Sequence, residues 1–129
     1  MLLSLPSVEN LRVRVGIDLV SIPRLTALLS DTAFLQHAFQ PVERQDSRPE
    51  HLAGILAAKE ACFKAIGRQP IWLAVVVAGS CNHPQLSLAP AIEPPGLVSL
   101  DVSITHEGDY AVAAVVMLLR EEASVDELP

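Results

Sequence analysis

The sequence of 129 residues is poor in aromatic side chains, in positive charge and in cysteine. Only five residues are aromatic (three Phe, one Tyr and one Trp), so Val, Leu, Ile and Ala have to fill the interior. No run of about 18 apolar residues occurs, so we expect no membrane-spanning helix. The first residues, Met1 to Pro6, lack a basic segment followed by a long apolar run, so we expect no signal peptide.

The few cysteines and basic residues argue against two further classes of protein. Cys62 and Cys81 do not have metal-ligand spacing, and without an export signal we expect reduced thiols in the cytoplasm. Residues 1–68 carry eight Lys/Arg and seven Asp/Glu, whereas residues 69–129 carry one and eight, which gives the net charge of −6. Because nucleic-acid binders usually carry a clustered basic face and this sequence shows none, we expect no nucleic-acid partner.

The composition and the absence of divisions predict one domain. Half of the residues are hydrophobic and 19% are charged, which suits one buried core and is too apolar for a disordered chain. No internal repeat and no linker divide the chain. We therefore expect a single domain over residues 1–129, with an ordered core over 10–119 and an acidic, frayed tail over 120–129.

The first part of the sequence predicts a strand followed by two short helices. Apolar residues alternate with Arg and Gly over residues 12–17, which is the period of a half-buried strand with Val13, Val15 and Ile17 as its apolar set. Ser21 is expected to cap a helix with Pro23 in its first turn. Asp31 is expected to cap a second helix that ends before Pro41.

The clearest predicted element is a helix over about residues 48–66. Ser47 and Glu50 form the pattern of a capping box, and apolar residues then recur at helical spacing. A stripe of small residues on this helix lets another backbone approach closely, and it consists of Gly54, Ala57, Ala58, Ala61 and Ala65. Gly67 is a typical stop signal for the helix.

The second half of the sequence predicts a sheet. Strand patterns occur at residues 71–78, 85–88, 100–105 and 110–119, with turn signals at 82–84 and 107–109. The last strand is apolar on both faces, so one face needs the helix and the other needs a further layer or a neighbouring subunit. The predicted fold class is α+β, an antiparallel sheet packed on one long helix with short helices before it.

Four polar residues stand where packing does not require them, namely Asp18, Glu60, Lys64 and His106. Each has an ordinary interpretation. Glu60 and Lys64 form a favourable i,i+4 surface pair worth about 0.3 kcal/mol, Asp18 can begin a helix cap, and His106 can satisfy turn backbone groups. Together they suggest phosphoryl chemistry, because two carboxylates can hold Mg²⁺ and a lysine can neutralise a phosphate. Spacing alone does not select this interpretation.

Three segments carry recognisable motifs. Residues 15–20 read Val-Gly-Ile-Asp-Leu-Val and are followed by Ile22-Pro23-Arg24-Leu25. Residues 58–61 read Ala-Lys-Glu-Ala and are followed by Lys64-Ala65. Residues 101–106 read Asp-Val-Ser-Ile-Thr-His and are followed by Tyr110-Ala111-Val112-Ala113. In this order, they resemble the motifs of the holo-acyl-carrier-protein synthase family, the small phosphopantetheinyl transferases. The resemblance spans residues 13–119.

The resemblance implies transfer of 4′-phosphopantetheine from coenzyme A to a serine of an apo acyl carrier protein, with release of adenosine 3′,5′-bisphosphate. It implies that Asp18 and Glu60 bind Mg²⁺, that Glu60 accepts the serine proton and that Lys64 holds phosphate oxygens. The remaining implied positions are Gly67, Ser103 and His106 at the nucleotide and Arg24 at the carrier protein. The family fold is α+β, and its short members are homotrimers with active sites between subunits.

The sequence departs from the family pattern at two places. Ile55 stands where the family often has arginine, Leu56 stands where it often has an aromatic residue, and Gly67 is followed directly by Arg68 in place of a longer glycine-rich loop. Two alternatives to an active transferase stay open, of which only the first rests on these departures. One is a non-catalytic homologue that binds coenzyme A or a carrier protein, and the other is a metal-dependent phosphohydrolase.

Overall fold

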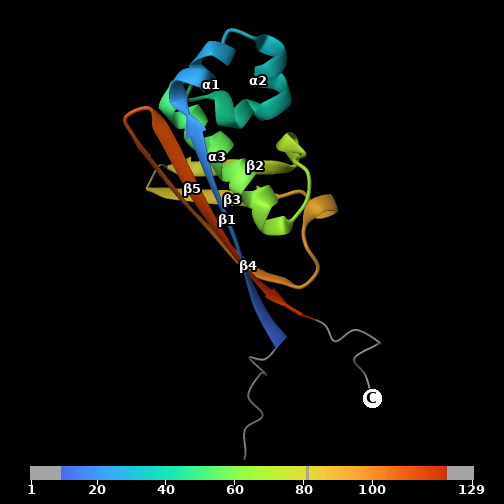
Figure 1. Ribbon diagram of the computed structural model, residues 1–129. Coiled ribbons are helices and arrows are strands. Elements are labelled where there is room, and N and C mark those ends of the chain that lie inside the picture. The colour runs from blue at the N-terminus through green and yellow to red at the C-terminus, as the bar shows by residue number, and fades with distance from the viewer. Residues whose placement is uncertain (1–9, 81, 122–129) are drawn as a thin grey trace, which may run out of the picture.

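The computed structural model describes residues 10–80 and 82–121, which pack around one hydrophobic core (Figure 1). The helices are α1 (Ile22–Leu28), α2 (Thr32–Ala38) and α3 (Pro49–Ile66). The strands are β1 (Leu11–Ser21), β2 (Val75–Ser80), β3 (His83–Leu88), β4 (Leu97–Glu107) and β5 (Tyr110–Arg120). Short 3₁₀ turns lie between them as η2 (Pro41–Arg44), η3 (Trp72–Ala74) and η4 (Pro90–Ile92). The predicted α+β class is confirmed.

The three long strands form one antiparallel sheet in the order β1-β5-β4, and β2 pairs with β3 in a separate hairpin. Figure 1 shows α1 and α2 at one end of this sheet and α3 running along one of its faces. Helix α3 contacts all three strands of the sheet, and it also contacts α1, β2 and η2. Because it is covered on so many sides, most of its residues are buried, including its whole stripe of small residues.

The small residues of α3 serve a close approach to β1. Gly16 on β1 lies against the helix, and a Cβ atom at that position would collide with the carbonyl oxygen of Ala61. Ala65 lies next to the same point, with its backbone nitrogen 3.0 Å from the position of such a Cβ atom. Glycine on the strand is therefore required for the two backbones to touch.

Several expected boundaries are confirmed by side-chain and backbone contacts. Ser21 Oγ accepts a hydrogen bond from the backbone N–H of Arg24 at 3.3 Å, which caps α1. Asp31 Oδ1 accepts from two backbone N–H groups at the start of α2, at 3.0 and 3.2 Å. Gly67 ends α3 in the left-handed conformation with φ of 86°. The hairpin between β4 and β5 turns at residues 108 and 109 as expected.

Three local predictions differ from the structure. The capping box is not formed, because Arg48 rather than Ser47 is the N-cap residue of α3 and Pro49 occupies the first turn. Residues 71–78 are not one strand, because residues 72–74 form η3 and β2 starts at Val75. The carbonyl of Trp72 accepts a hydrogen bond from the buried Lys59 side chain at 3.0 Å, so a tertiary contact outweighs the β propensity there. The turn expected at residues 82–84 is shorter, since β3 already begins at His83.

The apolar set of β1 faces away from the helix rather than into the core. Val13, Val15, Ile17 and Leu19 are 59% to 62% exposed, while Gly16 and Val20 of the opposite face are buried. In the paired register these four residues lie opposite Leu118, Val116, Ala114 and Val112 of β5. The predicted alternation is therefore present with the opposite orientation, and the outer face of β1 and β5 is apolar and uncovered in a single chain. We call it the outer sheet face.

None of the helices in the described part of the chain combines the length and the hydropathy that a membrane crossing requires.

Candidate active site

Asp18 enters the site from the middle of β1. It belongs to the strand face that packs on α3, two residues after Gly16 and two before the buried Val20. Because the strand and the helix touch at Gly16, the carboxylate of Asp18 comes within reach of the side chains of Glu60 and Lys64, which lie one turn apart on α3. Its side chain is 11% exposed. The polar residue that interrupts the strand pattern is thus held against the helix.

Lys64 forms an ion pair with Asp18. Its Nζ atom donates to Asp18 Oδ1 at 2.8 Å and to the backbone carbonyl of Ile17 at 3.1 Å. The hydrogen bond from Lys64 to Asp18, with the charge of the carboxylate, raises the pKa of Lys64. Lys64 is 59% exposed, so its ammonium group remains open to an anion from solution. The i,i+4 pair of Glu60 with Lys64 is not the main contact here, because Asp18 is the partner of the lysine.

Glu60 lies beside the Asp18 carboxylate, and its ionisation is strongly disfavoured. Partial burial is the largest of the effects that raise the pKa of Glu60 to about 8; the neighbouring Asp18 carboxylate raises it further, and Lys64 acts in the opposite direction. At neutral pH, the Glu60 carboxyl can therefore hold or release a proton with little cost. A group with these properties next to a second carboxylate is typical of functional sites.

The donor set of this site fits a divalent cation. Asp18 Oδ2 is buried and has no hydrogen-bond partner in residues 10–80 and 82–121. Nowhere in those residues do three or more His, Cys, Asp or Glu side chains gather as metal ligands. The protein therefore offers the carboxylates of Asp18 and Glu60, and this small set suits Mg²⁺, which keeps waters and takes phosphate oxygens from a substrate.

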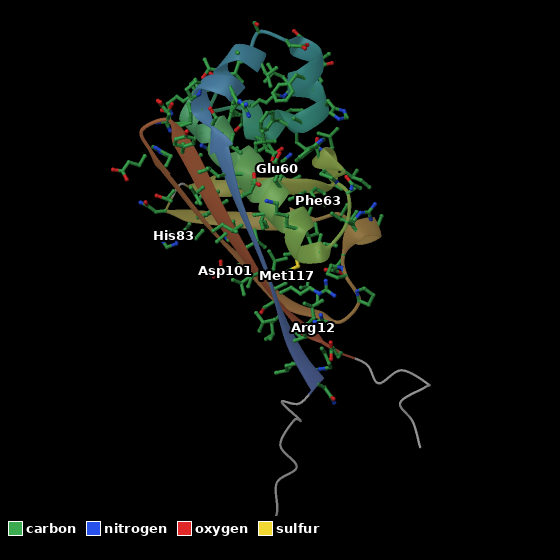
Figure 2. All side chains as sticks on the ribbon, in the orientation of Figure 1. Arg12, Glu60, Phe63, His83, Asp101 and Met117 are labelled. Carbon is green, nitrogen blue, oxygen red and sulfur yellow. The ribbon has the colours of Figure 1, made fainter. Side chains whose placement is uncertain are left out.

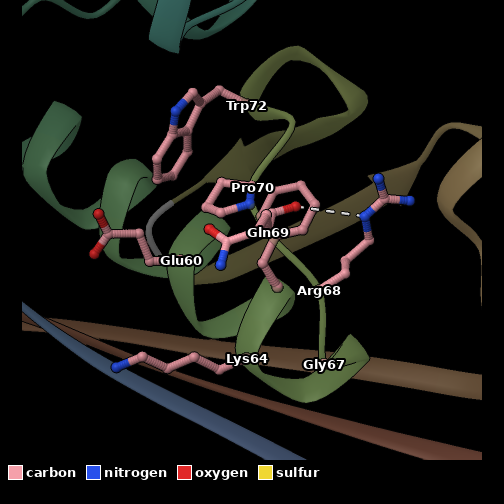
Figure 3. Close-up of a pocket in the computed structure, with 8 residues that line it drawn as sticks. Glu60, Lys64, Gly67, Arg68, Gln69, Pro70 and Trp72 are labelled. Atoms are coloured by element: carbon pink, nitrogen blue, oxygen red, sulfur yellow. Dashed lines mark hydrogen bonds between the residues drawn. The ribbon is translucent and has the colours of Figure 1, made fainter.

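A pocket of about 660 Å³ opens beside Glu60 and Lys64 (Figure 3). Besides these two residues, it is lined by the chain that follows α3 and by two aromatic rings, namely Gly67, Arg68, Gln69, Pro70, Phe63 and Trp72. The rings of Phe63 and Trp72 pack edge to face with centroids 6.2 Å apart. In Figure 3, the side chains of Glu60 and Lys64 extend to one side of the pocket and that of Arg68 to the other. The carboxyl group of Glu60 and the ammonium group of Lys64 therefore open onto a space that can hold a small molecule.

The structure brings together some of the predicted site residues and separates others. Asp18, Glu60 and Lys64 meet, and Gly67 lines the same pocket. Ser103 and His106 are exposed on β4, which is separated from β1 by β5, and neither lines the pocket. Arg24 is exposed on α1. Within one chain, therefore, the third motif lies apart from the carboxylates.

Lys59 and Glu43 are a supporting pair that the sequence reasoning missed. Both side chains are completely buried, with Lys59 Nζ 2.6 Å from Glu43 Oε1. Lys59 precedes Glu60 and also binds the carbonyl of Trp72, a residue of the pocket wall. The sequence does contain a signal for this pair, because Lys59 stands among the small residues of the helix. A buried ammonium group requires a carboxylate or other hydrogen-bond acceptors.

Ile55 and Cys62 both belong to the core. Ile55, the position where an arginine was expected by resemblance, is 2% exposed and packs with the other apolar residues of α3. Burial raises the pKa of Cys62 to about 12, so its thiol stays protonated and unreactive. Cys81 lies outside the described residues.

Comparison with known proteins gives consistent similarities. Residues 14–115 match the model of the 4′-phosphopantetheinyl transferase superfamily. A holo-[acyl-carrier-protein] synthase of Frankia alni is 39% identical over 112 residues, which cover 81% of this chain and 95% of the relative.

Solved structures are similar over the same length. The structure of the Helicobacter pylori holo-[acyl-carrier-protein] synthase in complex with coenzyme A is 31% identical with a TM-score of 0.69, covering 80% of this chain and 98% of that one. The Chronobacterium ammoniagenes ACPS–CoA complex is 34% identical with a TM-score of 0.73, covering 86% and 99%. The similarity therefore includes the fold, and the matched residues 14–115 span the three segments that carry the motifs.

Proposed function

The chain belongs to the 4′-phosphopantetheinyl transferase superfamily, and from this premise we propose that it transfers 4′-phosphopantetheine from coenzyme A to a serine of an apo acyl carrier protein. The observation that carries the proposal is the ion pair of Asp18 with Lys64 next to Glu60, since Lys64 and Glu60 both line a pocket. The named relatives and the two coenzyme A complexes agree with it.

The reaction exchanges one phosphorus–oxygen bond for another. The serine Oγ attacks the phosphorus that carries pantetheine, and the bond from this phosphorus to the bridging oxygen breaks. The bridging oxygen leaves with adenosine 3′,5′-bisphosphate. The carboxylate of Glu60 accepts the serine proton, a role suited to a group whose pKa is raised to about 8.

Lys64 and Asp18 prepare the site for the diphosphate. Lys64 is mostly exposed and already oriented by Asp18 and the Ile17 carbonyl, so its ammonium group can bind phosphate oxygens with little reorganisation. Asp18 and Glu60 are the residues that would hold Mg²⁺. When bound, this cation supplies charge neutralisation on the diphosphate.

The direct test is transfer itself. Incubation with coenzyme A, Mg²⁺ and a panel of apo carrier proteins from fatty-acid and polyketide synthesis should add the mass of phosphopantetheine to one of them, detected by mass spectrometry. An unmodified panel, under conditions in which a related synthase modifies its own carrier, would contradict the proposal.

We do not favour the non-catalytic homologue or the phosphohydrolase, because both carboxylates and the lysine are in place and the phosphohydrolase leaves the third motif unexplained.

We further propose a homotrimer whose active sites use residues from two copies. The outer sheet face supports this proposal. Four large apolar residues of β1 are about 60% exposed there, and the neighbouring strand β5 is apolar too, so a second copy of the chain would remove apolar surface from water. Ser103 and His106 support it as well, since they lie away from the pocket of their own chain. In the trimer, the neighbouring copy would bring them to the nucleotide.

Charged substitutions on the outer sheet face test the assembly. Val15→Lys should convert the trimer into monomers in analytical ultracentrifugation and reduce transfer. Val42→Lys is the matched control, because Val42 is similarly exposed, at 51%, but lies in η2, outside the sheet. A wild-type monomer at micromolar concentration with full activity would contradict the proposal.

Arg24 is proposed to contact the carrier protein. It is exposed near the start of α1, where the positive end of a helix gives a cation no benefit, so an acidic partner explains it better. Arg24→Glu should raise the KM for the carrier in a salt-dependent way and leave coenzyme A affinity unchanged. Arg48→Glu, the same charge change on another surface, is the control. Equal carrier KM values for wild type and Arg24→Glu would exclude this role. The cytoplasmic location stays a prediction from the sequence.

A further inference from the structure

A second concavity, of about 680 Å³, lies at the end of the sheet opposite to α1 and α2, where Figure 2 labels Arg12. Its charged lining consists of four arginines and two glutamates, namely Arg12, Arg14, Arg68, Arg120, Glu93 and Glu121. We call it the arginine groove. Four of the nine basic residues of the chain gather here, although they are spread over more than a hundred positions of the sequence.

The fold brings these arginines together from three separate parts of the chain. Arg12 and Arg14 face the helix side of β1 because the apolar residues of that strand face outward. Arg68 follows the C-terminal end of α3, and Arg120 ends β5. The groove carries a net charge of two positive units, in a chain whose net charge is −6. A local positive field in an acidic protein indicates a negatively charged ligand.

Three of the four guanidinium groups already have a partner in the protein. Arg12 Nη1 is 3.1 Å from Glu121 Oε1, and Arg14 Nη1 donates to the carbonyl of Ile66 at the end of α3, at 3.5 Å. Arg68 donates through Nε to the neighbouring carbonyl of Gln69 at 3.4 Å. In residues 10–80 and 82–121, neither Arg68 nor Arg120 forms an ion pair. These two side chains are therefore available to an anion.

The remaining lining is apolar. Ile66, Ile92 and Leu119 contribute to the groove together with two consecutive prolines, Pro94 and Pro95. Planar guanidinium groups match the oxygens of a phosphate group, and an apolar wall suits a flat ring. The concave shape and the volume fit a small molecule with both features rather than an extended polymer.

We propose that the arginine groove binds a phosphate monoester carried on a nucleoside. The phosphate is inferred from the groove alone, whereas the choice of a nucleoside rests on the proposed function. Arg68 lines both the groove and the candidate active-site pocket, so the two concavities adjoin at that residue. The ligand has two possible sources: the 3′-phosphate end of a coenzyme A molecule whose diphosphate lies at Lys64, or a separate nucleotide.

The ion pair of Arg12 with Glu121 allows a test with opposite expected signs. Adenosine 3′,5′-bisphosphate is titrated by calorimetry into wild type, Arg12→Gln and Glu121→Gln, with EDTA present. Arg12→Gln removes a cation and leaves Glu121 unpaired, so the Kd should rise about fivefold. Glu121→Gln releases Arg12 for the ligand, so the Kd should fall by about twofold to fivefold. Both variants break the same ion pair, and a purely structural role would shift them in the same direction.

Two control variants break a comparable ion pair elsewhere. Arg48 and Asp46 form a surface pair at 2.7 Å on a segment that does not line the groove. Arg48→Gln and Asp46→Asn should leave the Kd unchanged, which separates the groove from the effect of net charge. Thermal unfolding of all four variants checks that each is folded.

Coenzyme A and 3′-dephospho-coenzyme A identify the source. A weaker Kd of Arg12→Gln for coenzyme A but not for the dephospho form would assign the groove to the 3′-phosphate of the substrate. A loss that concerns adenosine 3′,5′-bisphosphate alone, and persists when coenzyme A is saturating, would assign it to a separate nucleotide. Either result supports the groove. Equal Kd values in wild type, Arg12→Gln and Glu121→Gln, or shifts of equal sign, would overturn it. Binding here needs no transfer, so the groove and the proposed function can fail independently.

Discussion

Two lysines on α3, only five residues apart, form ion pairs of opposite character. Lys59 and Glu43 are completely buried, and the three hydrogens of the Lys59 ammonium have three acceptors, Glu43 Oε1 and the carbonyls of Ala38 and Trp72, at 2.6, 2.8 and 3.0 Å. Glu43 in turn accepts from the backbone N–H groups of Gln40 and Val77, at 2.7 and 2.9 Å. This network is fully satisfied and ties α3 to η2, η3 and β2.

The second pair is incomplete. Lys64 is mostly exposed, Asp18 keeps one buried oxygen without a hydrogen-bond partner, and Glu60 beside it resists ionisation. A satisfied buried network stabilises a single arrangement, whereas an unsatisfied and accessible one leaves bonding capacity for a ligand. The same helix therefore carries a structural pair, Lys59 with Glu43, and a reactive pair, Lys64 with Asp18. The N–O distances of the two pairs are similar, and what distinguishes the pairs is whether all of their polar atoms have hydrogen-bond partners.

Removing the structural lysine should have the largest effect on stability. Lys59→Ala leaves Glu43 as an unpaired buried carboxylate, which costs about 3–5 kcal/mol. Lys64→Ala, the matched control in the exposed pair, should cost less than about 1 kcal/mol. Urea unfolding followed by the fluorescence of Trp72, the single tryptophan, measures both. If Lys59→Ala does not fold, Lys59→Gln provides the milder comparison. Equal losses for Lys59→Ala and Lys64→Ala would contradict the distinction.

Changing the reactive carboxylates should instead remove activity and preserve the fold. Glu60→Gln and Asp18→Asn should each reduce transfer about 100-fold or more, because the first removes the proton acceptor and the second removes the charge that orients Lys64. Neither should lower the midpoint of thermal unfolding. Turnover near the wild-type value in either variant, measured by mass spectrometry with Mg²⁺ present, would exclude the assigned roles.

The raised pKa of Glu60 should make stability depend on pH. In the unfolded chain, Glu60 loses its proton near pH 4.5, whereas in the folded protein it keeps the proton up to about pH 8. The stabilisation is therefore complete below pH 4.5 and is lost as the pH rises toward 8. Because Glu60 is partly exposed, solvent screening reduces the effect to about 1–2 kcal/mol. Urea unfolding between pH 4 and 9 with EDTA should show this decline in wild type but not in Glu60→Gln.

A divalent cation should partly restore the stability that is lost as the pH rises toward 8. This is the smallest of the expected effects. Mg²⁺ at about five times its Kd should stabilise the folded protein by about 1 kcal/mol. The gain should be absent in Asp18→Asn, which loses one of the two carboxylates, and present in Asp46→Asn, which lies outside the site. Thermal unfolding with and without Mg²⁺ measures the difference. An equal gain in Asp18→Asn would place the cation elsewhere.

The sequence predicts the carboxylates of the active site better than it predicts the structural pair. Asp18 and Glu60 interrupt apolar patterns, and interruptions are visible along the chain. Lys59 also interrupts such a pattern, but its partner Glu43 lies 16 positions away in a 3₁₀ turn, and no local rule connects the two. The period of β1 is equally visible, yet alternation does not tell which face a single chain buries. The arginine groove is invisible for the same reason, because its members meet only through tertiary contacts.

The contact of Gly16 with Ala61 also determines how accurately the site is built. Strand and helix meet backbone to backbone there, so no flexible side chain lies between the element that carries Asp18 and the element that carries Glu60 and Lys64. The separation of the reactive groups is therefore set by covalent geometry and hard atomic contact, which tolerate less variation than side-chain packing does. A misplacement of about 1 Å can slow a reaction about 100-fold. The absence of a side chain at Gly16 therefore helps to fix the distance between Asp18 on β1 and the reactive groups on α3.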